Sequence, residues 1–299
     1  MFTGRSYANP AIYTPRAAIA RRLNGLHEVE SNLSRRGRSY YRADLVPFIM
    51  NRPIMLKRSH RFGLLRETLL VMTVIAAALI VAVILLVCLG DTGLRFAIAA
   101  PLGFGLISAA MLIALPAYPY ARFGLANTLT TLRAGLTTFI GAMLFEGERL
   151  NPNEPGLAWL ITAVAATALI LDGLDGRAAR ATRSSSRFGA RFDMEIDALL
   201  ILLLCGLLWV SGKLGPWILA LGSMRYGFGV ARLLSDRLNG ELTESRRRKT
   251  VCVVQGVVLC VALAPIVPAP VAAAITAVAL FALAYSFAVD IVDLVSRRC

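Results

Sequence analysis

The sequence predicts an all-α protein that crosses a membrane about eight times. The chain has 299 residues, 57% of them hydrophobic, and its mean hydropathy is +0.65. A water-soluble protein of this size would expose too much apolar surface at that composition. Apolar segments long enough to cross a bilayer core, about 20 residues each as helices, recur along the chain. These two observations favour a polytopic membrane protein.

The predicted spans follow one another with short polar or proline-containing breaks between them. Breaks are expected at Pro116 and Pro119, at "NPNEPG" (151–156), at "GKLGP" (212–216) and at "PIVPAP" (265–270). The seventh span is short, and the fourth and fifth carry aspartates. The eight spans are expected near residues 69–89, 96–117, 127–147, 157–175, 189–211, 216–234, 250–265 and 270–292.

The distribution of Lys and Arg predicts how these spans are oriented. If the N-terminus is cytoplasmic, only Arg95, Arg149 and Lys213 lie in loops on the opposite side, while nearly all other loop cations are cytoplasmic. This asymmetry follows the positive-inside rule. We therefore expect an integral protein of the bacterial inner membrane with both termini in the cytoplasm. The same bias accounts for the net charge of +14, so no nucleic-acid partner is predicted.

Residues 1–68 precede the first predicted span and form a basic cytoplasmic arm. The segment "YTPRAAIARRLNGLHEVESNL" within it is able to form an amphipathic helix. Two interpretations stay open for this arm. It is either a solvated basic segment or a segment that attaches to anionic lipid headgroups.

Four aspartates stand at the cytoplasmic ends of the fourth and fifth spans. Asp172 and Asp175 are three residues apart, and Asp193 and Asp197 are four apart, so each pair shares one helix face. A tight hairpin between the spans would bring the two pairs together, whereas Glu195 would point elsewhere. Carboxylates this close repel one another, and hard divalent cations such as Mg²⁺, Mn²⁺ or Ca²⁺ relieve the repulsion.

Small and basic residues surround these aspartates. Small side chains let the phosphates of a ligand approach the helix backbone, and guanidinium groups suit phosphate. The pattern predicts a site for a metal-bound diphosphate at the membrane surface. The small residues are Gly173, Gly176, Ala178, Ala179, Gly189 and Ala190, and the arginines are Arg177, Arg180, Arg183, Arg187 and Arg191.

This stretch resembles the CDP-alcohol phosphatidyltransferase family. The family pattern D-x2-D-G-x2-A-R-x8-G-x3-D-x3-D is matched at all eight positions. The resemblance implies a six-helix core, which fits the spans from 127 to 292. The expected organisation is a basic arm at 1–68, two additional transmembrane helices at 69–117 and the transferase core at 118–299. The matching residues are Asp172, Asp175, Gly176, Ala179, Arg180, Gly189, Asp193 and Asp197.

The resemblance also implies a reaction. A CDP-lipid such as CDP-diacylglycerol would bind through two Mg²⁺ or Mn²⁺ ions, and an alcohol would displace CMP. Asp172, Asp175 and Asp193 would be the principal metal ligands, and Asp197 would complete the set and act as general base. In addition, Arg180 would neutralise phosphate charge, and Gly176 and Ala179 would leave room for the nucleotide. Family members are often homodimers, so a homodimer is expected here.

A second likeness lies in the third predicted span. The segment "NTLTTLR" (127–133) is similar to the family stretch that contains the cytidine and the diphosphate, with Asn127 and Thr130 in that role and Arg133 supporting them. The alternative is an ordinary polar helix start with Asn127 as its N-cap. Ser186 stands where some members have a hydroxyl that contacts the nucleotide, close to Gly189.

The acceptor alcohol is predicted from cations near the same membrane face. Arg225 and Arg232, seven apart, share one face of the sixth span, and "SRRRKT" (245–250) adds Lys249. These cations favour a phosphorylated polyol, either glycerol 3-phosphate or an inositol phosphate. They are equally explained by snorkelling and by positive-inside bias. A choline or serine acceptor and a membrane transporter are the alternatives, although the transporter interpretation lacks the internal repeat such proteins usually show.

Overall fold

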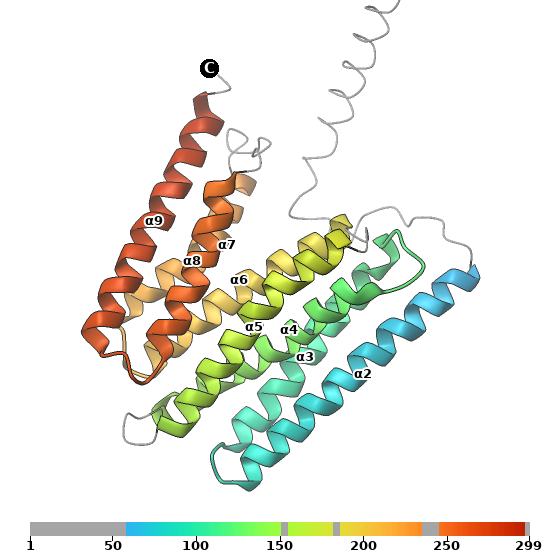
Figure 1. Ribbon diagram of the computed structural model, residues 1–299, viewed down its shortest axis with the longest axis horizontal. Helices are drawn as coiled ribbons and strands as arrows, with labels where there is room; N and C mark the ends of the chain where they lie inside the picture. The colour runs from blue at the N-terminus through green and yellow to red at the C-terminus, as the bar shows by residue number, and fades with distance from the viewer. Residues whose placement is uncertain (1–57, 151–154, 182–185, 235–244, 297–299) are drawn as a thin grey trace, which may run out of the picture. The chain divides into compact units, whose positions relative to one another are not determined.

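The computed structural model describes residues 58–150, 155–181, 186–234 and 245–296, and all regular structure in these ranges is helical (Figure 1). The predicted all-α fold is therefore confirmed. The long helices are α2 (Arg58–Cys88), α3 (Leu94–Ala114), α4 (Gly124–Ala142), α5 (Pro155–Ala181), α6 (Arg187–Val210), α7 (Leu219–Leu234), α8 (Arg246–Leu263) and α9 (Ala269–Ser296). Short 3-10 helices are η1 (Leu115–Ala117), η2 (Met143–Arg149) and η3 (Pro216–Ile218).

Each predicted span corresponds to one of these long helices, but several helices extend beyond the apolar run. α2 begins at Arg58 rather than near residue 69, and α5 continues to Ala181 rather than ending near 175. Residues 1–57, which hold most of the predicted basic arm, lie outside the described part of the chain. Apolar character marks the part of a helix that crosses the bilayer, whereas hydrogen bonding along the backbone lets the helix continue into polar surroundings.

Five helices in the described ranges are long and apolar enough to span a membrane, which points to an integral membrane protein. They cover Arg61–Cys88, Leu94–Ala114, Gly124–Gly147, Pro155–Gly173 and Ala269–Asp293. The other three fall short for identifiable reasons. α7 has only 16 residues, α8 opens with the basic run Arg246–Lys249, and α6 carries Asp193, Glu195 and Asp197 in its first half.

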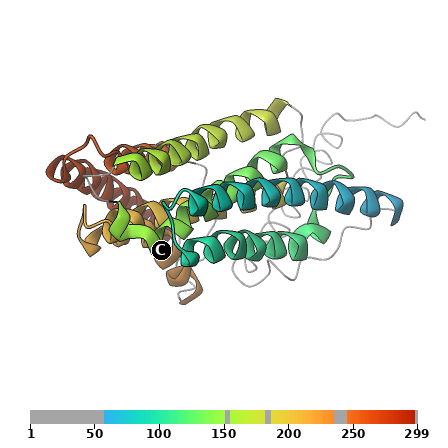
Figure 2. The ribbon, with the colours of Figure 1, turned by 90° about the horizontal axis from the view of Figure 1, so that it is seen from below.

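α4 is the most enclosed of the candidate spans. Of the most apolar stretch of this span, 61% is buried inside the protein, against 17–28% for the other four spans. It packs against α3, α5 and α6, and α2 also contacts it, as both views show (Figures 1 and 2). Polar side chains inside a membrane helix are expected to face the bundle. On α4 the buried polar residues are Asn127, Thr130, Thr131, Arg133, Thr137 and Thr138.

The threonines of α4 other than Thr137 hydrogen-bond to the backbone of their own helix. The hydroxyl of Thr130 donates to the Ala126 carbonyl at 3.1 Å, and that of Thr131 donates to the Asn127 carbonyl at 2.7 Å. Such bonds to the preceding turn let a hydroxyl be buried without a partner on another helix. The polar stripe of α4 can therefore sit in the bundle interior at low cost.

The packing continues from α4 through α5 and α6 to α8 and α9. Both α5 and α6 pack on α4, and α8 packs on α5, α6 and α9. Asp290 of α9 is almost completely buried and pairs with Arg247 and Arg248 at the start of α8, the second at 3.3 Å. These ion pairs join the first turn of α8 to the last part of α9.

Candidate active site

Three of the four predicted aspartates converge where α5 and α6 meet α4. Asp172 lies on α5, and Asp193 and Asp197 lie one turn apart on α6. One carboxylate oxygen from each lies within 4.8 Å of the other two. All three side chains are partly exposed, so a ligand can reach them. Glu195 does not belong to this group, which agrees with its expected position on another helix face.

The fourth aspartate, Asp175, lies on the last turns of α5, where the backbone is described but the side chains are not. The same holds for three further residues of the motif and for Arg177, while Arg183 lies outside the described residues altogether. The predicted roles of these side chains therefore lie outside the described structure. They are Asp175, Gly176, Ala179, Arg180, Arg177 and Arg183.

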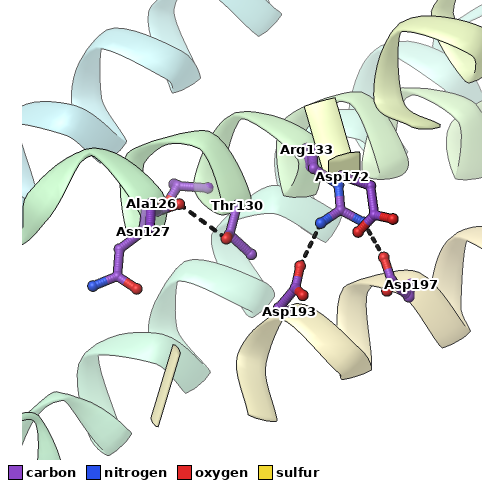
Figure 3. Close-up of polar contacts among 8 residues, drawn as sticks. Ala126, Asn127, Thr130, Arg133, Asp172, Asp193 and Asp197 are labelled. Atoms are coloured by element: carbon purple, nitrogen blue, oxygen red, sulfur yellow. Dashed lines mark hydrogen bonds and ion pairs between the residues drawn. The ribbon is translucent and has the colours of Figure 1, made fainter. Parts of the chain in front are cut away.

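Arg133 of α4 lies at the centre of the aspartate group (Figure 3). Its side chain is completely buried, and its Nη2 atom lies 3.0 Å from Oδ1 of Asp172. The Nη1 atom contacts Asp193, and Nη2 also contacts Asp197. One guanidinium thus bridges α4, α5 and α6. The sequence suggested only a supporting role for Arg133, because nothing in the sequence alone indicates which neighbours a buried helix faces.

The donor set of this group fits a divalent cation. Arg133 contacts all three carboxylates, which together carry more negative charge than one guanidinium offsets. The ligand atoms are all oxygens, which suits hard ions such as Mg²⁺ or Mn²⁺ and does not suit zinc. Asp172, Asp193 and Asp197 could therefore hold such an ion.

Asn127 and Thr130 line the same side of α4, nearer its start. Both are buried, and the Asn127 amide donates to the Phe123 carbonyl at 2.7 Å. Because α4 begins at Gly124 with Phe123 as its N-cap, the alternative that Asn127 is the N-cap is wrong. A Cβ atom at Gly189 would lie only 2.9 Å from the Asn127 side-chain oxygen, so glycine allows this close approach between α4 and α6.

Ser186 forms the N-cap of α6. Its side-chain oxygen accepts the Gly189 backbone N–H at 2.9 Å, a standard way to satisfy the first amides of a helix. A serine hydroxyl that accepts one hydrogen bond can still donate another. The cap fixes the turn that leads into Asp193, and its hydroxyl stands at the same end of α6 as the aspartates.

Of the cations predicted for the acceptor, Arg225 has an acidic neighbour. Arg225 on α7 pairs with Glu195 on α6 at 3.3 Å, with both side chains substantially exposed. Lys249 on α8 is exposed. The side chain of Arg232 lies outside the described part. On α8, Arg247 and Arg248 both pair with Asp290, so their positive charge is partly offset within the protein.

Comparison with family models finds a match over residues 123–290 to the CDP-alcohol phosphatidyltransferase model. This match covers more than half of the chain. The chain belongs to the CDP-alcohol phosphatidyltransferase family. The predicted family resemblance is confirmed, and with it the expectation of an enzyme that transfers a phosphatidyl group from a CDP-alcohol to an acceptor.

The phosphatidyltransferase match begins at Phe123, the N-cap of α4, and ends at Asp290 on α9. It therefore contains the six helices α4 to α9 and leaves α2 and α3 outside. Asp172, Asp193, Asp197 and Arg133 all fall within it. No curated protein and no solved structure matches the chain.

Proposed function

We propose that this phosphatidyltransferase moves the phosphatidyl group of a CDP-lipid, such as CDP-diacylglycerol, to a small alcohol and releases CMP during phospholipid synthesis. The observation that carries the proposal is the convergence of Asp172, Asp193 and Asp197 from the two halves of the aspartate motif. A cluster of carboxylates would repel a diphosphate, so such a cluster suits phosphoryl transfer only when divalent cations bind between them.

Asp172, Asp175 and Asp193 would be the principal ligands of two Mg²⁺ or Mn²⁺ ions, and Asp197 would complete the set. A pair of divalent ions stabilises negative charge on the attacking and leaving oxygens of a phosphoryl transfer. Asn127, Thr130 and Ser186 would contact the nucleotide and the diphosphate. Gly176, Ala179 and Gly189 would leave room for them, and Arg180 would offset phosphate charge.

Asp197 would act as the general base. Its carboxylate takes the proton of the acceptor hydroxyl, the hydroxyl oxygen forms a bond to the β-phosphorus, and the bond to the CMP oxygen breaks. The side chain of Asp197 is 37% exposed. That exposure suits a base that must afterwards pass its proton to water.

The setting is proposed from charge and from the family match together. The aspartate group would face the cytoplasm of a bacterial cell, with residues 1–68 as a cytoplasmic arm, 69–117 as two additional membrane helices and 118–299 as the catalytic core. Nearly all loop Lys and Arg residues then lie on the cytoplasmic side, which is also where a soluble acceptor and released CMP would exchange.

The first test is metal dependence. Purified protein in detergent or nanodiscs with Mn²⁺ and CDP-diacylglycerol is expected to release CMP when an acceptor is present. Excess EDTA should abolish the release, and a surplus of Mn²⁺ or Mg²⁺ should restore it, because the carboxylates alone would repel the diphosphate. Chromatographic measurement of CMP gives the result, and undiminished turnover in EDTA would contradict this mechanism.

The proposed acceptor is a phosphorylated polyol, either glycerol 3-phosphate or an inositol phosphate, with Arg225, Arg232 and Lys249 as its phosphate contacts. One observation favours a second candidate. The Arg225–Glu195 pair presents a cation and an anion side by side, which would match the amino and carboxylate groups of serine. A panel of glycerol 3-phosphate, inositol 1-phosphate, serine and choline in the CMP assay distinguishes these acceptors.

Variants at this pair separate the two candidates further. We expect Arg225→Ala to raise the acceptor KM about five- to tenfold, with the KM for CDP-lipid nearly unchanged, since one charged hydrogen bond at a partly exposed site is lost. Glu195→Gln should lower the KM for a phosphorylated acceptor, because a competing carboxylate is removed, but should raise it for serine. Arg149→Ala is the matched control, because Arg149 is an exposed arginine in η2. Equal KM changes for both substrates would contradict an acceptor site here.

A further inference from the structure

The start of α4 is capped by a side chain from another helix. Phe123, the N-cap residue, makes no capping hydrogen bond through its own side chain. Instead its backbone N–H donates to Oε2 of Glu67 on α2 at 3.0 Å. A carboxylate at this position both satisfies an amide that the helix leaves unpaired and offsets the positive end of the helix dipole. Glu67 lies outside the region that matches the family.

The carbonyl of the same residue holds two side chains of the site. Phe123 accepts hydrogen bonds from the Asn127 amide at 2.7 Å and from the Tyr118 hydroxyl at 3.1 Å. Burial is the main cause that raises the pKa of Tyr118, with a smaller opposing contribution from Asn127, so this phenol stays protonated and donates. Glu67 therefore holds the backbone N–H of Phe123, and the carbonyl of the same residue orients Asn127.

Asn127 has little room to adjust if Phe123 moves. Its side-chain oxygen lies so close to Gly189 that a Cβ there would be 2.9 Å away. Gly124 adds a further constraint, because its φ of +79° is a left-handed conformation that favours glycine. A shift of the first turn of α4 would therefore displace Asn127 relative to the start of α6.

The α2–α3 hairpin is also bound to α4 at its opposite end, by a similar contact with no link to the site. There Glu146 in η2 accepts the Gly93 backbone N–H at 2.8 Å, and Arg149 pairs with Glu146 at 3.3 Å and donates to the Gly90 carbonyl at 3.0 Å. The hairpin thus has one glutamate contact next to Asn127 and another in η2, beyond the C-terminal end of α4. The second contact provides an internal control.

We propose that Glu67 is a positioning residue for the nucleotide part of the site, and that α2 serves the reaction by fixing the start of α4 through it. The inference rests on the proposed function in one respect, since it takes Asn127 as a contact of the CDP group. Its ligand is therefore the cytidine diphosphate moiety of the CDP-lipid, and the acceptor plays no part in it.

The experiment measures the Kd for CDP-diacylglycerol, the KM and kcat for CMP release and the midpoint of thermal unfolding in full-length protein. Glu67→Ala is expected to raise the Kd and KM for CDP-lipid about three- to tenfold, with kcat within about twofold. This is less than the full effect of a lost hydrogen bond to a charged group, because Glu67 is exposed and acts on the CDP group only through Asn127. Glu67→Gln should stay near wild type, because its amide oxygen still accepts the Phe123 N–H. Glu67→Asp should resemble Glu67→Ala, because its carboxylate is one methylene short.

Glu146→Ala is the matched control. It should lower the unfolding midpoint at least as much as Glu67→Ala, because Glu146 is buried whereas Glu67 is exposed, but leave the Kd for CDP-lipid unchanged. An unchanged Kd in Glu67→Ala and Glu67→Asp would overturn the proposal. So would a Kd raised equally in Glu146→Ala, or a Glu67→Gln as weak as Glu67→Ala. Wild-type protein that binds CDP-lipid without releasing CMP would count against the proposed reaction alone. Should Glu67→Ala be too unstable to purify, Glu67→Asp carries the same test.

Discussion

Replacement of Asp197 with asparagine is expected to lower kcat by about 10²–10⁴-fold, the usual contribution of a positioned general base. The amide keeps the shape of the side chain and one coordinating oxygen, but it cannot take a proton from the acceptor. Affinities for Mn²⁺ and for CDP-lipid should therefore stay close to those of the wild type. Turnover, Mn²⁺ binding and CDP-lipid binding are measured on the same preparation.

Asp193→Asn is the comparison variant for this experiment. Asp193 belongs to the same oxygen group and has nearly the same exposure as Asp197, but its proposed role is to bind the cation. It should lose Mn²⁺ affinity together with activity. If Asp197→Asn lost Mn²⁺ affinity as severely, Asp197 would be a principal cation ligand like Asp193, and its assignment as the base would be wrong. If it kept normal turnover, the role taken from the family would be wrong at this residue.

The aspartate group illustrates what spacing along one chain can predict. Asp193 and Asp197 share a face because they are one helical turn apart. The short connection between α5 and α6 keeps the end of α5 close to the start of α6, which brings Asp172 next to them. The same local reasoning correctly separated Glu195 from the group. It did not reveal that the face carrying Glu195 meets Arg225 of α7, since that contact depends on how α6 and α7 pack.

The helices themselves were predictable because apolar runs of bilayer length are strong signals. Their polar ends were not, and Glu67 shows the consequence. It lies in the part of α2 that precedes the predicted span, and its partner Phe123 is 56 residues away. No periodicity in the sequence relates these two residues, so only the packing of α2 beside α4 could reveal the contact.

Arg133 was placed in the correct span, but its position among the carboxylates was not foreseen. Its contacts with Asp193 and Asp197 join residues 60 and 64 apart. A buried arginine in a membrane helix indicates a partner, yet the sequence around α4 contains no acidic residue to supply one. The partners come from α5 and α6, and they are the same carboxylates that are proposed to bind the cations.

This arrangement predicts that Arg133 and divalent cations stabilise the same three carboxylates. In EDTA, Arg133→Met should destabilise the protein by about 2–3 kcal/mol. That is below the usual range for a broken buried ion pair, because the carboxylates remain about one-third exposed to water. Methionine keeps the length and much of the volume of arginine, so the loss reflects charge more than a cavity. Thermal unfolding in detergent measures the effect.

Addition of Mn²⁺ should then raise the unfolding midpoint of Arg133→Met more than that of the wild type, since the cation supplies the positive charge that the variant lacks. Arg133→Lys, which keeps one charge but loses the fork that reaches three carboxylates, should lie between them. Arg247→Ala is the matched control, because it weakens the pair with Asp290 away from the aspartate group and should gain nothing extra from Mn²⁺. An equal Mn²⁺ response in Arg133→Met and the wild type would mean that Arg133 does not share the charge of the cation site.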